Sequence, residues 1–216
     1  MMKTNNPKRG YKLTEIGEIP EEWEVVKLGQ VSKIRYGLGQ PPELDSTGIP
    51  MIRATDFKRG RFISDSVIRV KLEGIPRGKN PFLKKSDIIV VRSGVYTGDI
   101  LMYDGRWKIA VAGYDLVVSP SDTIDSVFIT EYLLSKSSQS YFRSQSTRSA
   151  QPHLNSKQLS NTIVPQPSLP EQQKIAKILS KMNEKIEMEL KRKQRLQELK
   201  KGLMQVLLTG KVMVKV

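Results

Sequence analysis

Arginine, lysine, amide and tyrosine side chains recur on glycine- and proline-bearing turns of this 216-residue chain. Arginine and lysine can bind a phosphate or the acceptor edge of guanine, and glutamine can bind the edge of adenine. The loop residues that could do this chemistry are Gln40, Arg53, Lys58, Arg59, Arg61, Lys79, Arg92, Tyr96, Arg106, Arg148 and Gln151. For each of them taken singly, a solvated surface charge or polar group is the alternative.

The residue types of a catalytic centre are scarce. His153 is the single histidine and cysteine is absent, so a histidine-based metal site, a catalytic histidine network and thiolate chemistry all lack members. Residues 79–82 read KNPF, a faint echo of the motif of adenine methyltransferases that lacks its second proline and a preceding glycine-rich loop. The loop at residues 37–42 lacks the spacing of a phosphate cradle. We therefore predict no catalytic residue and no metal site.

The charge indicates an anionic partner. The net charge is +14 and the pI is near 9.9. Residues 171–216 carry 12 basic and 5 acidic side chains, which leaves 36 − 12 = 24 basic and 22 − 5 = 17 acidic before them, a net +7 in each part. The excess is spread through the fold, and double-stranded nucleic acid explains it best. No apolar run approaches membrane-spanning length and no signal peptide is evident, so we expect a soluble cytoplasmic protein with no membrane partner.

Short strands joined by glycine and proline turns predict a mostly β domain over residues 1–165, within an α+β chain. Strands are expected at residues 24–28, 31–36, 49–54, 87–92, 100–103 and 116–118. The run DIIVVR at residues 87–92 is typical of a buried strand. A helix is expected over residues 125–142, and a short one over residues 155–159, with Asn155 as its cap.

Residues 166–210 predict one long helix, followed by a tail at residues 211–216. Ser168 and Pro170 suit its start, and Gly210 suits a left-handed stop at its end. Apolar residues at helical spacing form two stripes, which consist of Ile175, Ile178, Leu179, Met182 and Ile186, and of Leu196, Leu199, Leu203, Val206 and Leu207. The all-polar residues 191–195 break a strict heptad between them. We expect a coiled coil with a partner helix, from a second chain or a second repeat; a terminal helix packed on its own domain is the alternative.

Five blocks of sequence, in this order, resemble the DNA specificity subunits of type I restriction–modification systems. They are IGEIPEEWEVVKLG at 16–29, SDIIVVRSG at 86–94, SAQPHLN at 149–155, PQPSLPEQQKIAKIL at 165–179 and LKKGLMQVLLTG at 199–210. The resemblance implies a target recognition domain that reads one DNA half-site, followed by a spacer helix. The usual subunit has two of each, and its two helices pack antiparallel as a coiled coil, whereas this chain has one of each. The resemblance therefore implies an antiparallel coiled coil between this helix and that of a partner. It also implies a two-fold homodimer that reads inverted half-sites, or pairing with a different half, which would read an asymmetric target.

The resemblance also implies the partners. The chain would bind adenine methyltransferase subunits that use S-adenosylmethionine, and cleavage would belong to a further restriction subunit that uses ATP and Mg²⁺. It would itself bind none of these cofactors and catalyse nothing. Two other functions stay open: a coiled-coil scaffold with non-specific DNA affinity, and a fragment of a nuclease or methyltransferase.

Overall fold

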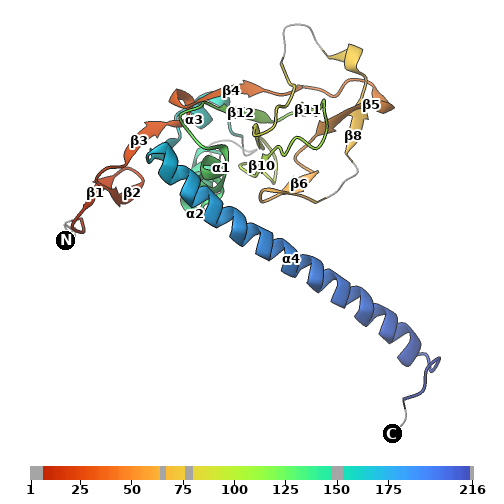
Figure 1. The fold of residues 1–216 in the computed structure, drawn as a ribbon. Helices are drawn as coiled ribbons and strands as arrows, with labels where there is room; N and C mark the ends of the chain where they lie inside the picture. The colour runs from red at the N-terminus through yellow and green to blue at the C-terminus, as the bar shows by residue number, and fades with distance from the viewer. Residues whose placement is uncertain (1–6, 64–66, 76–79, 147–152, 215–216) are drawn as a thin grey trace. The chain divides into compact units, whose positions relative to one another are not determined.

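The computed structural model describes residues 7–63, 67–75, 80–146 and 153–214 (Figure 1). The chain divides into two compact units, Met1–Ala176 and Lys177–Val216. The first unit holds all of the described strands, and most of the second is one helix. This confirms the α+β class, with a β-rich domain and a long C-terminal helix. Among the described residues, no helix is both long enough and apolar enough to span a membrane.

A four-stranded antiparallel sheet forms the centre of the domain. Its strand order is β10-β9-β12-β4. The bounds of these strands are Ser32–Tyr36 for β4, Ile88–Val90 for β9, Ile100–Met102 for β10 and Leu116–Pro120 for β12. In one row of the sheet, Leu116 faces Tyr36 on one side and Val90 on the other. The last residues of β4 and β9 and the first residue of β12 therefore lie side by side at one end of the sheet.

Strand β9 is buried on both faces. Ile88 and Val90 belong to a core that includes Phe128 and Phe142 of the helices. On the opposite face, Ile89 joins a second core, which also contains Val91, Phe57 and Tyr103. Because successive side chains of a strand point to opposite faces, an uninterrupted apolar run fits a strand that is covered on both sides. The prediction of a buried strand at DIIVVR is confirmed.

The remaining strands are short and pair in smaller sheets. A three-stranded sheet has the order β11-β5-β8, with β11 parallel and β8 antiparallel to β5. The other pairs are β1 with β2, β3 with β13, and β6 with β7. The bounds are Tyr11–Thr14 for β1, Gly17–Pro20 for β2, Glu24–Lys27 for β3, Leu44–Ile52 for β5, Phe57–Lys58 for β6, Arg61–Phe62 for β7, Ile68–Val70 for β8, Val111–Ala112 for β11 and Ile163–Gln166 for β13, with 3₁₀ turns at Leu28–Gln30 and Leu72–Gly74.

The single helix expected over residues 125–142 was wrong. The structure has α1 at Ser126–Leu134 and α2 at Lys136–Ser146, separated by Ser135, whose ψ of 157° is extended. Hydroxyl groups favour the break, because the Ser138 hydroxyl donates to the Tyr132 carbonyl at 2.8 Å, a group that would otherwise accept a helical hydrogen bond. The short helix is confirmed as α3 (Ser156–Ser160), with the predicted Asn155 cap accepting from the Gln158 amide at 2.9 Å.

The long helix α4 spans Leu169–Leu207. Beyond its end, Gly210 has φ of +69°, as expected of a left-handed stop. Gln172 and Ala176 in its first turns are buried, and Ile175 packs against the domain core. The compact unit therefore runs past residue 165 to Ala176. Ile175, one of the residues predicted to lie in the coiled-coil stripe, is half-buried against this core.

Replacing Gln172 by alanine should lower the free energy of unfolding by about 2 kcal/mol. The Gln172 side chain is completely buried. It accepts from the Asp125 amide at 2.8 Å and donates to the Pro167 carbonyl at 2.9 Å, and alanine would leave these groups unpaired. Urea denaturation of Gln172→Ala, with the exposed Gln173→Ala as its control, measures the effect. Equal stabilities of the two variants would contradict this account of the contact.

Candidate nucleic-acid interface

Arg92 lies between two tyrosine rings at the end of the central sheet where β4 and β9 finish and β12 begins. Its guanidinium carbon is 4.9 Å from the Tyr36 ring centroid and 3.9 Å from that of Tyr114, and Nη2 donates to the Tyr114 hydroxyl at 2.7 Å. Tyr36 ends β4, Arg92 follows β9 and Tyr114 precedes β12, so the sheet register brings the three together. We call these residues the arginine–tyrosine cluster. An arginine stacked on partly exposed tyrosines can bind a phosphate or a guanine with little loss of side-chain freedom.

The backbone around this cluster is held by Leu154, just before α3, and by Ser156, the first residue of α3. The Leu154 amide donates to the Arg92 carbonyl at 2.7 Å, and the Ser156 amide donates to the Tyr36 hydroxyl at 3.2 Å. The side-chain hydrogen bond of Ser156, together with this backbone hydrogen bond, lowers the pKa of Tyr36. His153 forms a β-bridge with Ser93, which is a structural role. His153 and Leu154, from the sequence block at residues 149–155, therefore hold the backbone at Arg92 and Ser93.

Asp115 is the buried acid beneath the cluster. It is 4% exposed and accepts from the Arg92 backbone amide at 3.4 Å. Burial raises its pKa from 3.8 to about 6, against the opposing effect of Arg92. Ionisation of the buried Asp115 carboxyl at neutral pH therefore lowers the stability of the fold. The positive charge of Arg92 offsets part of this cost.

This raised pKa predicts how stability depends on pH. A carboxyl whose pKa is higher in the folded state contributes stability below its unfolded pKa and loses that contribution as pH rises through the folded value. We therefore expect Asp115→Asn to be more stable than the wild type at pH 8 by on the order of 2 kcal/mol, with the difference vanishing near pH 4. Urea titrations at the two pH values test this. Asp122→Asn, on the surface, is the control, and a difference that does not change with pH would contradict it.

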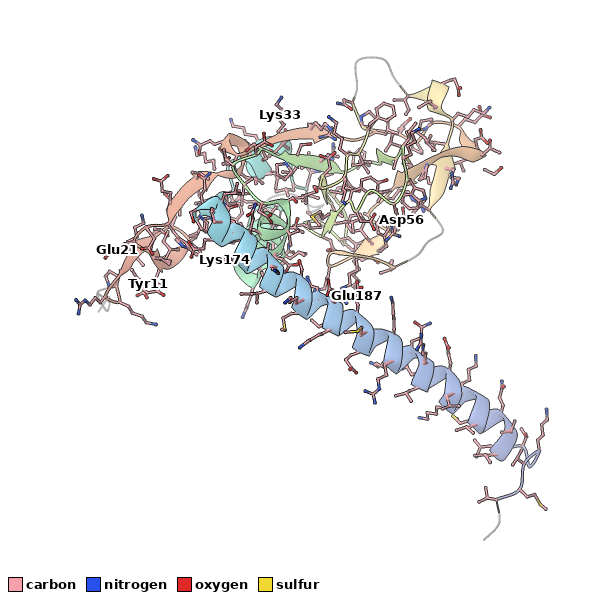
Figure 2. All side chains as sticks on the ribbon, in the orientation of Figure 1. Tyr11, Glu21, Lys33, Asp56, Lys174 and Glu187 are labelled. Atoms are coloured by element: carbon pink, nitrogen blue, oxygen red, sulfur yellow. The ribbon has the colours of Figure 1, made fainter. Side chains whose placement is uncertain are left out.

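Arg53 and Gln40 lie on loops that hydrogen-bond to Asp115, one to its carboxyl group and the other to its backbone carbonyl. The Ala54 amide hydrogen-bonds to Asp115, and Arg53 pairs with Asp56 at 3.2 Å. Asp56, just before β6, is labelled in Figure 2. The loop that carries the exposed Gln40 begins at Gly37, whose amide donates to the Asp115 carbonyl at 2.9 Å. The structure therefore links Gln40 and Arg53 to the arginine–tyrosine cluster.

A second group of candidates lies on two adjoining loops. Arg59 and Gly60 have φ of 47° and 81°, the conformation of a type I′ turn between β6 and β7. The Arg59 amide donates to the Asp99 carboxylate at 2.8 Å, which ties this hairpin to the β9–β10 loop. That loop exposes Val95 (91%) and Tyr96 (44%). Lys58 and Arg59 are exposed beside them, whereas Arg61 is half-buried. We call the β6–β7 hairpin and the β9–β10 loop the hairpin–loop group.

The other predicted residues stand apart from these groups. Arg106 pairs with Asp104 at 2.9 Å and stacks on Phe62 at 3.8 Å and on Trp107 at 5.6 Å, so much of its side chain serves local packing. Lys79, Arg148 and Gln151 lie outside the described residues. Among the residues that are described, no group of three or more acids or histidines could hold a metal ion.

Sequence reasoning did not select Tyr36, Tyr114 or Asp115. A usable signal was the placement of Tyr36 directly before the glycine loop at residues 37–42. A groove of about 660 Å³ was also missed. Its lining includes the cations Lys33, Lys84 and Lys85 as well as the acids Asp87, Asp122 and Asp125. Lys33, on β4, is labelled in Figure 2.

These features define a basic α+β domain whose loops offer arginine, lysine and tyrosine, followed by a long helix. The sequence pattern described as the type I restriction modification DNA specificity domain matches residues 20–200. The chain belongs to this family.

Two curated relatives come from Methanocaldococcus jannaschii. The chain is 29% identical to the type I restriction enzyme MjaVIII specificity subunit, over 96% of this chain and 50% of the relative. It is 31% identical to the putative type I restriction enzyme MjaX specificity subunit, over 96% of this chain and 47% of the relative. The chain thus spans about half the length of the curated relatives it matches.

Solved structures share the fold. The HsdS subunit from Thermoanaerobacter tengcongensis matches with a TM-score of 0.60 at 19% identity, over 92% of this chain and 47% of that one. A structure described as the basis of complex assembly and conformational transition of the type I R-M system matches with a TM-score of 0.64 at 19% identity, over 89% of this chain and 46% of that one.

Proposed function

We propose that this chain recognises DNA for a type I restriction–modification complex, with its domain reading one half of a two-part target. The family match over residues 20–200 carries the proposal. The net charge of +14 supports it, because contacts to phosphates supply much of the affinity of such proteins for DNA.

The arginine–tyrosine cluster and the hairpin–loop group form the proposed reading surface. Arg92, stacked and pre-organised, suits a guanine edge, and Gln40 suits adenine. Lys58 and Arg59 suit phosphates, because they are exposed on a turn that is held by a backbone hydrogen bond. Tyr96 and Val95 offer apolar surface for a base or a thymine methyl group.

The partners and cofactors follow from the same proposal. Adenine methyltransferase subunits would bring S-adenosylmethionine and modify the target. A restriction subunit would bring ATP and Mg²⁺. This chain would bind none of these cofactors and would contribute specificity alone, in the cytoplasm. The long helix would pair with the helix of a second recognition domain, so that two domains read two half-sites across an unread spacer.

Sequencing of methylated adenines tests the proposal. The chain is co-expressed with the methyltransferase subunit encoded beside it, in a host that lacks adenine methylation, and the methyltransferase expressed alone is the control. A two-part motif with a fixed gap that requires this chain is the expected result. A palindromic motif would indicate two identical domains, whereas an asymmetric motif would indicate a different second half. If both proteins are soluble and no motif appears, the scaffold function with non-specific DNA affinity takes its place.

A further inference from the structure

Loops that carry candidate DNA-binding residues meet at one buried residue, Asp115. Its backbone carbonyl accepts from the Gly37 amide at 2.9 Å, at the start of the loop that carries Gln40. Its carboxyl group accepts from the Arg92 amide at 3.4 Å and from the Ala54 amide. The three loops follow β4, β9 and β5, so one residue connects segments that are far apart in the sequence.

The carboxyl group of Asp115 holds two of these loops best when it is ionised. A carboxylate only accepts hydrogen bonds, and both of its partners here are backbone amides, which only donate. A protonated carboxyl group or an asparagine amide instead carries a donor and has fewer acceptor sites. Hydrogen bonds to an ionised acceptor are also roughly twice as strong as those to a neutral one. Loss of the charge therefore weakens the attachment of the Arg92 and Ala54 loops.

The charged groups that act on the Asp115 carboxyl come from two of the adjoining loops. Arg92, after β9, favours its ionisation, and Asp56, before β6, opposes it. Asp56 is itself paired with Arg53 at 3.2 Å. The tyrosines of the arginine–tyrosine cluster and His153 are the other titratable groups beside Arg92. Burial has the largest effect, so the ionised form exists at neutral pH at a cost in stability.

This cost coincides with an ordering role at the proposed reading surface. A residue that lowers stability while it orders a binding surface is typical of functional sites. The Arg92 guanidinium depends on the same acid. In the described part of the chain its Nε is buried without a hydrogen-bond partner. Stacking on the tyrosines, the hydrogen bond to the Tyr114 hydroxyl and the attraction of Asp115 therefore hold it in place.

From these contacts we propose that Asp115 is a positioning residue for target recognition. Its ionised carboxylate fixes the Arg92 and Ala54 loops relative to each other, and so sets how strongly the protein prefers its target over unrelated DNA. The inference rests on the proposed function for the DNA that these loops read. It adds that this preference depends on the charge of one buried acid.

Amide hydrogen exchange in the purified full-length chain tests the positioning without DNA. In Asp115→Asn at neutral pH, the Arg92 or the Ala54 amide should exchange about tenfold faster than in the wild type, because its acceptor is no longer charged. The Gly37 amide is the internal control, since it donates to the backbone carbonyl, which the substitution leaves in place. Unchanged exchange at Arg92 and Ala54, or equal acceleration at Gly37, would overturn the inference.

Competition binding measures the target preference itself. The chain is purified with the methyltransferase subunit, and the target duplex carries the motif found by methylation sequencing. The ratio of target affinity to affinity for unrelated DNA should fall about tenfold in Asp115→Asn, which corresponds to the net contribution of one hydrogen bond. Removal of a negative charge by itself would instead tighten the binding of both duplexes and leave the ratio unchanged. That outcome would contradict the positioning role. Asp122→Asn removes an exposed carboxylate and should keep the wild-type ratio.

The pH profile separates positioning from a merely structural role. Burial raises the pKa of Asp115 to about 6, so the carboxyl group takes up a proton as the pH falls through this value. The wild-type ratio should therefore fall about tenfold from about pH 8 to about pH 5, whereas Asp115→Asn should show a low ratio throughout. Other groups that titrate in this range, His153 included, are common to both proteins. The stability contributed by Asp115 rises over the same interval, so its loss of positioning is not a loss of folding. The same pH dependence in both proteins would overturn the inference.

These experiments fail separately from those on the proposed function. If methylation sequencing finds no motif, the hydrogen-exchange comparison still decides whether Asp115 positions the loops. If a motif is found and Asp115→Asn keeps the wild-type ratio at every pH, the function stands and the inference falls.

Discussion

Replacing Arg92 by alanine should weaken binding of the target duplex about 100-fold while weakening binding of unrelated DNA only a few-fold. The stacked guanidinium between Tyr36 and Tyr114 is held in one orientation, so a base contact made from it loses little entropy. A good bidentate contact to a base contributes about 1–3 kcal/mol of discrimination. The two affinities are measured by competition, with a duplex that carries the motif found by methylation sequencing.

Salt dependence separates the two chemical roles of Arg92. If its partner is a base, Arg92→Ala leaves the slope of log K against log salt unchanged and relaxes specificity at one position. If its partner is a phosphate, the slope falls by about one, and target and unrelated DNA lose affinity equally.

Two further variants test whether the stacked geometry matters. Arg92→Lys keeps a positive charge near Asp115 but loses the planar group, so it should lose nearly as much target affinity as alanine. Tyr114→Phe keeps the ring and removes only the hydroxyl that accepts from Arg92, so it should lose less than about fivefold. Wild-type target affinity in Arg92→Ala would assign Arg92 a structural role.

The elements that could be predicted from the sequence are those whose signal is local. The apolar stripes of α4, the apolar run of β9 and the Asn155 cap each lie within one continuous stretch of sequence. Strands β1, β2, β8 and β11 are two to four residues long, and their pairing partners decide their existence. Ser135 illustrates the same limit, because the helix break depends on which hydroxyl competes for which carbonyl.

The candidate site shows why contacts are harder to predict than elements. Arg92 was selected by its residue type, but its stacking partners come from β4 and from the residues before β12, which are brought together by long-range strand pairing. Arg106 was predicted to bind DNA by the same reasoning, but its guanidinium stacks on the Phe62 ring and so contributes to local packing. Helix α4 is the opposite case, because its existence was predicted from consecutive helix-forming residues without any long-range contact.

Replacing Gly37 by alanine should lower the free energy of unfolding by about 4 kcal/mol or prevent folding. A Cβ at this position would overlap the Gly113 carbonyl oxygen and lie 2.7 Å from that of Ala112. Both obstacles are backbone atoms beside the arginine–tyrosine cluster, and neither can rotate away. The Gly37 amide also donates to the Asp115 carbonyl, and the Leu38 amide donates to the Ala112 carbonyl. A shift of this loop would therefore break its hydrogen bonds to β11 and to the residue before β12.

The control for Gly37 is a glycine with open space around it. Gly202 lies within α4, and a Cβ there would meet nothing within 4 Å. Gly202→Ala should therefore stabilise the helix by about 1 kcal/mol. Thermal and urea unfolding of both variants measure the contrast. A Gly37→Ala variant that is as stable as the wild type would mean that the loop is not held by this close approach, and that Gln40 is free to move independently of Arg92.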